Sequence, residues 1–335
     1  EKEEIGHEKK AKRKEVPDFS EINGQQFVKR ACEIAVSGRH NLLMIGPPGA
    51  GKTMIARRIP GILPKMTEEE ALEVTKIYSV RGLLTESEAW MAERPFRNPH
   101  HTITPQGLAG GGMVPGPGEI SLAHHGVLFL DELAEFRRET LEILRQPMEE
   151  HCVKLARLAG NYEFPSDFML VAAMNPCRCG YYPDLNRCHC TKGMVEQYLK
   201  KISQPLLDRI DICVETKRVE YQDLIKENPH QETSAEIRKR VVAAMERQQQ
   251  RFAGTNIRYN SRIPAALLTK YCRLSTKQKQ YMESIYQKLE LTARSYHRIL
   301  RVARTIADMD GSDEILTRHL SEAVCYRNVD KKFWE

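Results

Sequence analysis

One octapeptide decides the fold class of this chain: Gly46, Pro47, Pro48, Gly49, Ala50, Gly51, Lys52 and Thr53. It matches G-x-x-x-x-G-K-[ST], the loop in which successive backbone N–H groups surround the phosphates of a nucleoside triphosphate. An apolar stretch at residues 41–45 precedes this loop, and helix-forming residues 54–58 follow it. Because strand, loop and helix are in the required order, we predict an ATP and Mg²⁺ site. In it, Lys52 contacts the β- and γ-phosphates and the Thr53 hydroxyl contacts the metal ion.

Polar residues follow two further apolar stretches that we predict to be buried strands. Asp131 and Glu132 come directly after residues 127–130, and Asn175 comes after residues 168–174. The carboxyl ends of parallel strands meet at one edge of a sheet, beside the phosphate loop. We therefore expect Asp131 to hold Mg²⁺ and Glu132 to polarise the water that attacks the γ-phosphate. Asn175 is a candidate for orienting that water, although asparagine before proline is also an ordinary turn former.

Phosphoryl transfer usually needs an arginine in addition to Mg²⁺. Arg209, within residues 205–211, and Arg294, at the start of a predicted helix, are the two candidates. The alternative for each is an exposed ion pair, which is the common fate of a surface arginine.

The composition is that of a globular protein, with 41% hydrophobic and 29% charged residues. No apolar stretch approaches the roughly 20 residues that a membrane-spanning helix needs, and we find no signal peptide. The nine cysteines are too few for a disulfide scaffold in 335 residues. We expect a cytoplasmic protein without a membrane partner. The net charge of +6 allows a polyanionic partner such as DNA but does not require one.

The distribution of strand and helix patterns predicts a parallel α/β domain followed by a helical domain. We expect tails at residues 1–16 and 328–335, the α/β domain at 17–216 and the helical domain at 217–327. In the first domain we expect helices at 25–37, 67–78 and 137–149, a mostly irregular segment at 94–118, a hairpin at 153–164 and a last strand at 210–214. In the second we expect helices at 232–252, 264–271, 276–290, 292–308 and 317–325.

Four cysteines lie within fourteen residues: Cys177, Cys179, Cys188 and Cys190. This density is typical of a structural Zn²⁺ site, although two C-x-C pairs depart from the usual C-x₂₋₄-C spacing. His189 is an alternative ligand, and four free thiols are the alternative interpretation. For the pairs His100-His101 and His124-His125 we expect packing or interface roles, because no carboxylate lies at ligand spacing.

The ordered set GPPGAGKT (46–53), VLFLDE (127–132), AAMN (172–175) and LLDRID (206–211) resembles the AAA+ ATPases. Within that class, residues 94–101, 117–124 and 175–180 resemble the ComM/YifB-type magnesium-chelatase-like proteins. The resemblance covers residues 17–327. It implies an AAA+ P-loop NTPase domain with a parallel sheet, followed by a small α-helical lid. Members of this family carry a Lon-protease-like N-terminal domain, and we expect this chain to begin after it.

The resemblance also implies roles for single residues. Arg209 corresponds to the arginine finger that completes a neighbour's active site, and Arg294 to the lid arginine that contacts the γ-phosphate in cis or in trans. Gly24 and Gln25 belong to the segment beside the adenine. A finger supplied in trans implies a homo-oligomeric ring, with a hexamer as the expected form. His125 departs from the asparagine that is common in the family, and we expect little effect on hydrolysis.

The ComM branch is associated with DNA branch migration during natural transformation. The resemblance therefore implies an ATP-driven, helicase-type motor that binds DNA without sequence preference. The hairpin at 153–164 resembles a pore-facing insertion, and Lys154 and Arg157 are its candidate DNA contacts. A protein-remodelling ATPase is the alternative. A metal-chelatase motor subunit is a weaker one, since the sequence lacks the D-x-S-x-S metal-adhesion motif of the partner subunit.

Overall fold

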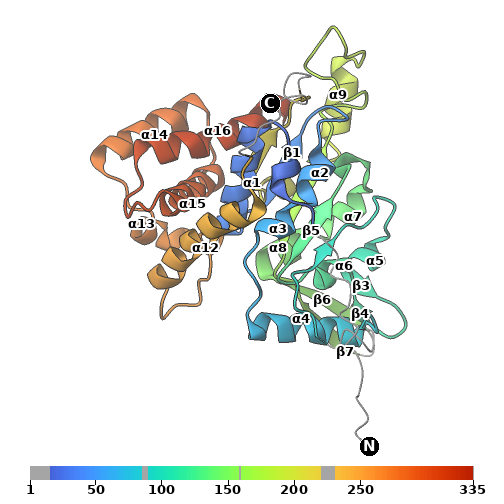
Figure 1. Ribbon diagram of the computed structural model, residues 1–335. Helices are drawn as coiled ribbons and strands as arrows, with labels where there is room; N and C mark the ends of the chain where they lie inside the picture. The colour runs from blue at the N-terminus through green and yellow to red at the C-terminus, as the bar shows by residue number, and fades with distance from the viewer. Residues whose placement is uncertain (1–15, 85–89, 158–159, 220–230, 335) are drawn as a thin grey trace, which may run out of the picture.

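The computed structural model describes residues 16–84, 90–157, 160–219 and 231–334 (Figure 1). Its centre is a five-stranded sheet in the order β2-β5-β8-β1-β9, in which every neighbouring pair is parallel. The strands are β1 (Leu42–Ile45), β2 (Phe96–Arg97), β5 (Val127–Leu130), β8 (Met169–Met174) and β9 (Ile212–Glu215). The strand order changes direction at β1, which has β8 on one side and β9 on the other. Such a point leaves a crevice at the carboxyl end of the strand, where ligands bind.

Both faces of the sheet are covered, which explains the uninterrupted apolar strands. Successive side chains of a strand point to opposite faces. Leu42 and Met44 accordingly belong to one hydrophobic core, and Leu43 and Ile45 belong to the other. All four residues of β1 are fully buried. The predicted α/β fold class with a parallel sheet is confirmed.

The α/β part carries mostly short helices, and Thr67 and Glu70 form a capping box at the start of α4, which with α1 is the longest of them. The helices are α1 (Gln26–Gly38), α2 (Lys52–Ala56), α3 (Ile59–Ile62), α4 (Glu68–Val80), α5 (Pro105–Ala109), α6 (Glu119–Leu122), α7 (Arg138–Glu142), α8 (Arg145–Glu150), α9 (Lys192–Leu199) and α10 (Gln204–Leu207). The helix predicted at 137–149 is two helices, α7 and α8. Pro147 lies in the first turn of α8, where the missing N–H costs no hydrogen bond.

The C-terminal part is helical, as predicted, and lies to one side of the sheet (Figure 1, orange to red). Its helices are α12 (Ser234–Arg251), α13 (Leu268–Tyr271), α14 (Thr276–Lys288), α15 (Ala293–Met309) and α16 (Thr317–Trp334). Apolar residues of α12 and α15, such as Val241 and Ile299, share one core with Leu42 and Met44 of β1. In this core α12 and α15 pack on α1, which lies against β1 and β9, and α16 contacts β9 itself.

The predicted C-terminal tail at 328–335 is wrong, because α16 continues to Trp334. Phe333 is buried and its ring lies 6.4 Å from that of Tyr182, and the Trp334 indole N–H donates to the carbonyl oxygen of Leu199 at 3.2 Å. Burial of these aromatic side chains against the first part of the chain extends the helix. Of the predicted N-terminal tail, residues 1–15 lie outside the described residues. No helix in the described part of the chain is both long and apolar enough to cross a membrane.

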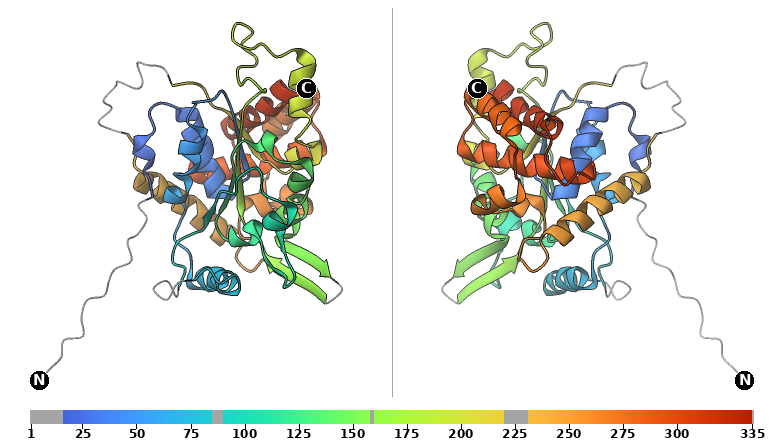
Figure 2. Two further views of the ribbon diagram at one scale, coloured as in Figure 1. Left: turned by 90° about the vertical axis from the view of Figure 1, so that its right-hand side faces the viewer. Right: turned by 90° about the vertical axis from the view of Figure 1, so that its left-hand side faces the viewer.

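Two small antiparallel ribbons lie outside the main sheet. The segment predicted to be mostly irregular, 94–118, contains β2, α5 and the ribbon of β3 (Gly110–Gly111) and β4 (Gly116–Pro117). The predicted hairpin is present as β6 (Cys152–Arg157) and β7 (Gly160–Pro165). Figure 2 shows this hairpin extending away from the sheet as a separate arm.

Candidate nucleotide-binding site

The phosphate loop leaves the carboxyl end of β1 and turns into α2 at Lys52. Gly49 and Gly51 have φ angles of +76° and +80°, a region that glycine adopts at no steric cost. The loop lines a cavity of about 420 Å³ together with Asp131, Glu132 and Asn175. Those three residues follow β5 and β8, so three neighbouring strands bring the predicted residues together.

Short polar contacts connect these side chains. The Thr53 hydroxyl donates to Asp131 Oδ2 at 2.5 Å. Lys52 Nζ donates to the carbonyl oxygens of Gly46 (2.7 Å) and Pro47 (2.9 Å) and to Asn175 Oδ1 (3.1 Å). Asn175 therefore contacts the lysine, which the sequence did not predict. The hydroxyl and carboxylate oxygens of Thr53 and Asp131 are the hard ligands that Mg²⁺ prefers.

Burial sets the electrostatics of Lys52. Desolvation lowers the pKa of its ammonium to about 8, although Asp131 and Glu132 oppose this shift. Neither carboxylate lies within hydrogen-bond range of Nζ among the contacts of the lysine. An anion arriving beside Nζ would compensate this desolvation, as the phosphates of a nucleotide do.

Glu132 is exposed at the mouth of this cavity and has a φ of +52°, a conformation that is costly for a residue other than glycine. Its Oε2 lies 3.3 Å from Nδ1 of His101. Sequence reasoning assigned His101 only a packing or interface role. His101 follows β2, and β2 pairs in parallel with β5, so the same edge of the sheet carries both residues. Recognition of β2 as a strand would have revealed this contact.

The segment at Gly24 and Gln25 lies beside the phosphate loop. Both residues have positive φ angles, +63° and +55°. Gln25 Nε2 donates to the carbonyl oxygen of Ala50 at 3.4 Å and to that of Lys217, just beyond β9. This segment therefore connects the loop to the end of the neighbouring strand.

Arg209 and Arg294 lie at the other end of the strands, beside their amino ends. They line a separate cavity of about 720 Å³ with Asn41, which precedes β1, and Asp211, which precedes β9. A strand rises about 3.3 Å per residue, so the four residues of β1 separate the amino end of the strand from its carboxyl end by roughly 13 Å. Neither arginine lies at the phosphate loop of its own chain.

Both arginines make ion pairs in this chain. Arg209 Nη2 pairs with the carboxylate of Glu149, and Arg294 Nη1 lies 3.5 Å from Asp208 Oδ2. The Arg294 side chain is 69% exposed, so it is accessible from outside the chain. Both arginines are thus in ion pairs, the alternative that the sequence left open; the pair of Arg294 is exposed and contributes little stability, whereas the Arg209 side chain is only 13% exposed.

The pair His124-His125 has a carboxylate neighbour after all, which corrects the sequence-based expectation. Glu73 Oε2, from α4, lies 3.0 Å from His124 Nε2 and 2.8 Å from His125 Nε2. The backbone N–H of Asp167 donates to His124 Nδ1 at 2.9 Å, so Nε2 carries the ring proton and is not available to a metal ion. Burial lowers the pKa of His124 to about 4, which keeps the ring neutral. The cluster connects α4 to the turn between α6 and β5.

The fold and this site define a class of protein, the AAA+ P-loop nucleoside triphosphatases. The chain belongs to the family described as magnesium chelatase, subunit ChlI, which matches residues 18–224; the C-terminal part of the same subunit matches residues 231–327. The predicted resemblance to ComM/YifB-type proteins is confirmed by the relatives described next.

Curated relatives match nearly the whole chain. The uncharacterized protein YifB of Escherichia coli (strain K12) is 45% identical over 314 residues, which is 94% of this chain and 61% of the relative. The competence protein ComM of Haemophilus influenzae is 43% identical over 310 residues, 92% of this chain and 60% of the relative. The uncharacterized protein Rv2897c of Mycobacterium tuberculosis is 38% identical over 313 residues, which is 93% of this chain and 62% of the relative. The chain thus spans about three fifths of the length of these relatives.

Proposed function

We propose that this chain hydrolyses ATP with Mg²⁺ and is the motor part of a homo-oligomeric ring, a hexamer in its expected form, that acts on DNA. The observation that carries the ATPase is the convergence of Lys52, Thr53, Asp131 and Glu132 on one cavity at the carboxyl edge of a parallel sheet. In this proposal the α/β domain spans residues 17–216 and the helical lid spans 217–327. Its location is the cytoplasm, because the cysteines of the described residues are all free.

In this proposal each side chain of the site has its own part in the reaction. Lys52 binds the β- and γ-phosphates. Gly24 and Gln25 lie on the side where the adenine would bind. Thr53 and Asp131 hold Mg²⁺, which supplies charge neutralisation on the phosphate oxygens. Glu132 accepts a proton from the attacking water, and Asn175 positions the lysine and the water.

The position of the two arginines supports a ring. Arginines that lie roughly 13 Å along β1 from their own phosphate loop do not reach that site, and service in the site of an adjacent copy would account for their position. We propose that Arg209 and Arg294 serve the ATP bound by a neighbouring chain. A head-to-tail contact of this kind closes into a ring when the rotation between copies allows it.

Replacing Lys52 by Ala should abolish measurable ATP binding, because no other cation of the described residues lines this cavity. Calorimetric titration with ATP and Mg²⁺ is the measurement. Lys76→Ala, on the exposed face of α4, is the matched control and should bind ATP as the wild type does. Wild-type affinity in Lys52→Ala would remove this cavity from the proposal.

The affinity for ATP should also fall as the pH rises above about 8, the pKa of Lys52 before phosphate binds. The protonated ammonium is the form that binds phosphate, and bound phosphate raises its pKa. The affinity for ATP is therefore at its full value below the pKa of the free site and falls above it. Lys52→Arg should show no such fall, because its guanidinium stays charged. A wild-type affinity that is constant between about pH 7 and 9.5 would contradict this role of the lysine.

The DNA role rests on three observations: the name of the relative ComM, the net charge of +6, and the protruding β6–β7 hairpin. On that hairpin Lys154 Nζ lies 2.8 Å from a Glu150 carboxylate oxygen, and Glu163 is its partner across the two strands. These carboxylates offset part of the positive charge that Lys154 and Arg157 bring. The hairpin contribution to DNA binding is therefore smaller than two full phosphate contacts.

The pair Lys154→Ala and Arg157→Ala should lower the slope of log affinity for DNA against log salt by about one, because each neutralised phosphate contributes about 0.9. Arg273→Ala with Lys279→Ala, both exposed in the helical part, is the matched control and should leave the slope unchanged. Filter binding of unrelated DNA sequences over a salt series measures it. An unchanged slope in the hairpin variant would remove the hairpin from the DNA path. Stimulation of ATP hydrolysis by unfolded protein and not by DNA would favour protein remodelling.

A further inference from the structure

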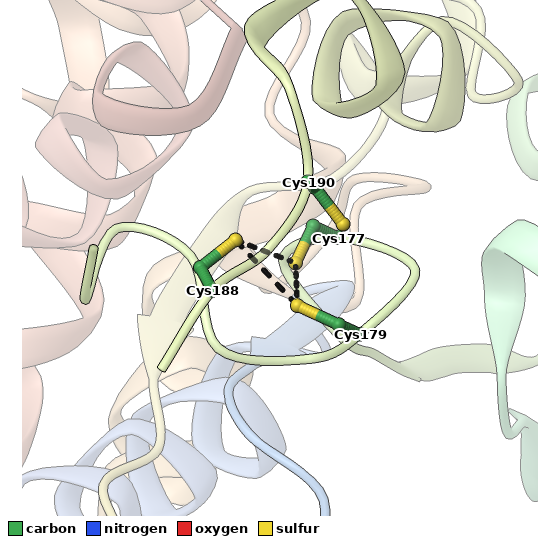
Figure 3. Close-up of side chains that lie close together, drawn as sticks. All are labelled: Cys177, Cys179, Cys188 and Cys190. Carbon is green, nitrogen blue, oxygen red and sulfur yellow. Dashed lines mark hydrogen bonds between the residues drawn. The ribbon is translucent and has the colours of Figure 1, made fainter. Parts of the chain in front are cut away.

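Four cysteine side chains converge on one point in the loop that follows β8 (Figure 3). Their sulfur atoms all lie within 4.8 Å of one another. Cys177 Sγ is 3.3 Å from Cys179 Sγ and 3.7 Å from Cys188 Sγ, and the last two are 3.5 Å apart. His189 is exposed and does not belong to this group. The two C-x-C pairs therefore supply four sulfur atoms to one place.

The separations of 3.3 to 3.7 Å among Cys177, Cys179 and Cys188 are close to those of a tetrahedral metal site. Zinc binds thiolate sulfur at about 2.3 Å, which places the sulfurs of a regular tetrahedron about 3.8 Å apart. A disulfide needs a sulfur–sulfur distance of about 2.05 Å, so the cluster is not a pair of disulfides. Thiolate is the ligand type that selects zinc over the harder cations.

The loop around the cluster is irregular, although Cys177 and Cys188 lie in a hydrophobic core and Tyr181 and Tyr182 pack against it. Between β8 and α9 it contains no helix or strand among the described residues. Its backbone is organised around the sulfurs: the N–H of Tyr182 donates to Cys177 Sγ at 3.4 Å, and the N–H of Gly180 donates to the Cys177 carbonyl oxygen at 3.0 Å. Cys177 and Cys188 are buried. Binding of a metal ion adds to the stability of such an irregular loop, because the ligands are brought together only in the folded state.

The same loop forms a wall beside the phosphate loop. Gly180 has a φ of +88°, and a Cβ atom there would lie only 2.5 Å from Cδ of Pro48. A cavity of about 650 Å³ separates the two loops further out; Pro48 and Gly49 line one side, and Tyr181 and Tyr182 line the other. Asn175, which contacts Lys52, is only two residues before Cys177. The cysteine cluster thus lies in a segment whose first residues, Asn175 and Gly180, meet Lys52 and the phosphate loop.

We propose that Cys177, Cys179, Cys188 and Cys190 bind one zinc ion, and that this ion holds the loop against Pro48 so that the phosphate loop keeps its shape. The second half of this proposal rests on the proposed ATP binding. The first half does not, because the four sulfurs define a metal site whether or not the neighbouring cavity binds a nucleotide.

Elemental analysis of the protein purified without added metal or chelator tests the site. We expect one zinc ion per chain, and cobalt exchanged for zinc should show the visible absorption of a tetrahedral thiolate complex. Cys179→Ser and Cys190→Ser should each lower zinc affinity at least about tenfold, whereas Cys325→Ser, an exposed cysteine outside the cluster, should keep one zinc. Because the wild-type measurement needs no variant, a variant that fails to fold does not affect it. Iron in place of zinc, or metal-free folded protein with four reactive thiols, would overturn the proposal.

Gly180→Ala separates the two halves of the proposal. This variant keeps all four thiols and should retain one zinc ion, but the added methyl group meets Pro48 and should weaken ATP binding about tenfold. Gly254→Ala is the matched control, because Gly254 also has a positive φ (+75°) and a Cβ there meets nothing within 4 Å. Full ATP affinity in Gly180→Ala would overturn the coupling between the loops. If the wild type bound zinc but no ATP, the proposed function would fail while the zinc site stood.

Discussion

Replacing Glu132 by Gln should lower the rate of ATP hydrolysis by about 10³-fold while ATP binding stays close to that of the wild type. Glutamine keeps the shape of the side chain but cannot accept a proton from the attacking water. The affinity should remain, because the groups that contact phosphate and Mg²⁺, Lys52, Thr53 and Asp131, are unchanged. Release of phosphate under saturating ATP and calorimetric binding are the two measurements.

Glu135→Gln is the matched control for this experiment. Glu135 is also an exposed glutamate, three residues further along, and its carboxylate pairs with Lys201 at 3.6 Å outside the cavity. Its replacement should leave hydrolysis unchanged. Equal loss of binding and of turnover in Glu132→Gln would show that Glu132 holds the nucleotide or its metal ion, and the role of general base would then be wrong.

Arg209→Ala should also lower hydrolysis by about 10³-fold or more, the range in which arginine fingers act. ATP affinity should change little, because Arg209 lies at the other end of the strands from the phosphate loop of its own chain. The ion pair of Arg209 with Glu149 must open when the side chain enters a neighbouring site; Glu149 is exposed, whereas the Arg209 side chain is only 13% exposed. The measurement is the hydrolysis rate of the assembled protein at saturating ATP.

Arg318→Ala, an exposed arginine at the start of α16, should leave this rate unchanged and controls for a general loss of positive charge. Loss of assembly in Arg209→Ala would give the same low rate for a different reason, so the oligomeric state has to be measured alongside. Near wild-type hydrolysis in an assembled Arg209→Ala protein would leave Arg209 as a surface ion pair only.

Most of the nucleotide site could be predicted because its residues follow strands whose apolar stretches are long. Lys52, Asp131 and Asn175 each stand at the end of such a strand, and the edge of a parallel sheet brings them together without further information. His101 could not be found in this way. The strand before it, β2, has only two residues and lies in a segment rich in glycine and proline, where periodicity carries no signal.

Contacts between distant parts of the chain account for the other differences. Glu73 meets His124 across 51 residues of sequence, and no spacing rule reveals such a pair. The helix that carries Arg294 was predictable from its apolar periodicity, but the surface that this helix covers was not. Packing of this helix on α1 places Arg294 beside Asp208 and decides that it lies away from its own phosphate loop. The end of α16 is likewise determined by where Phe333 packs.

The most direct test of an ATP site shared between neighbouring copies is hydrolysis by mixtures of the two inactive variants, Glu132→Gln and Arg209→Ala. In a mixed ring, the Glu132→Gln chain supplies Arg209 to the intact Glu132 site of its neighbour. Random mixing of equal amounts should restore about a quarter of the wild-type rate if the sites act independently, because one contact in four then joins the two intact halves. A rate that never exceeds the weighted mean of the two variants at any ratio, in rings shown to exchange subunits, would contradict a shared site.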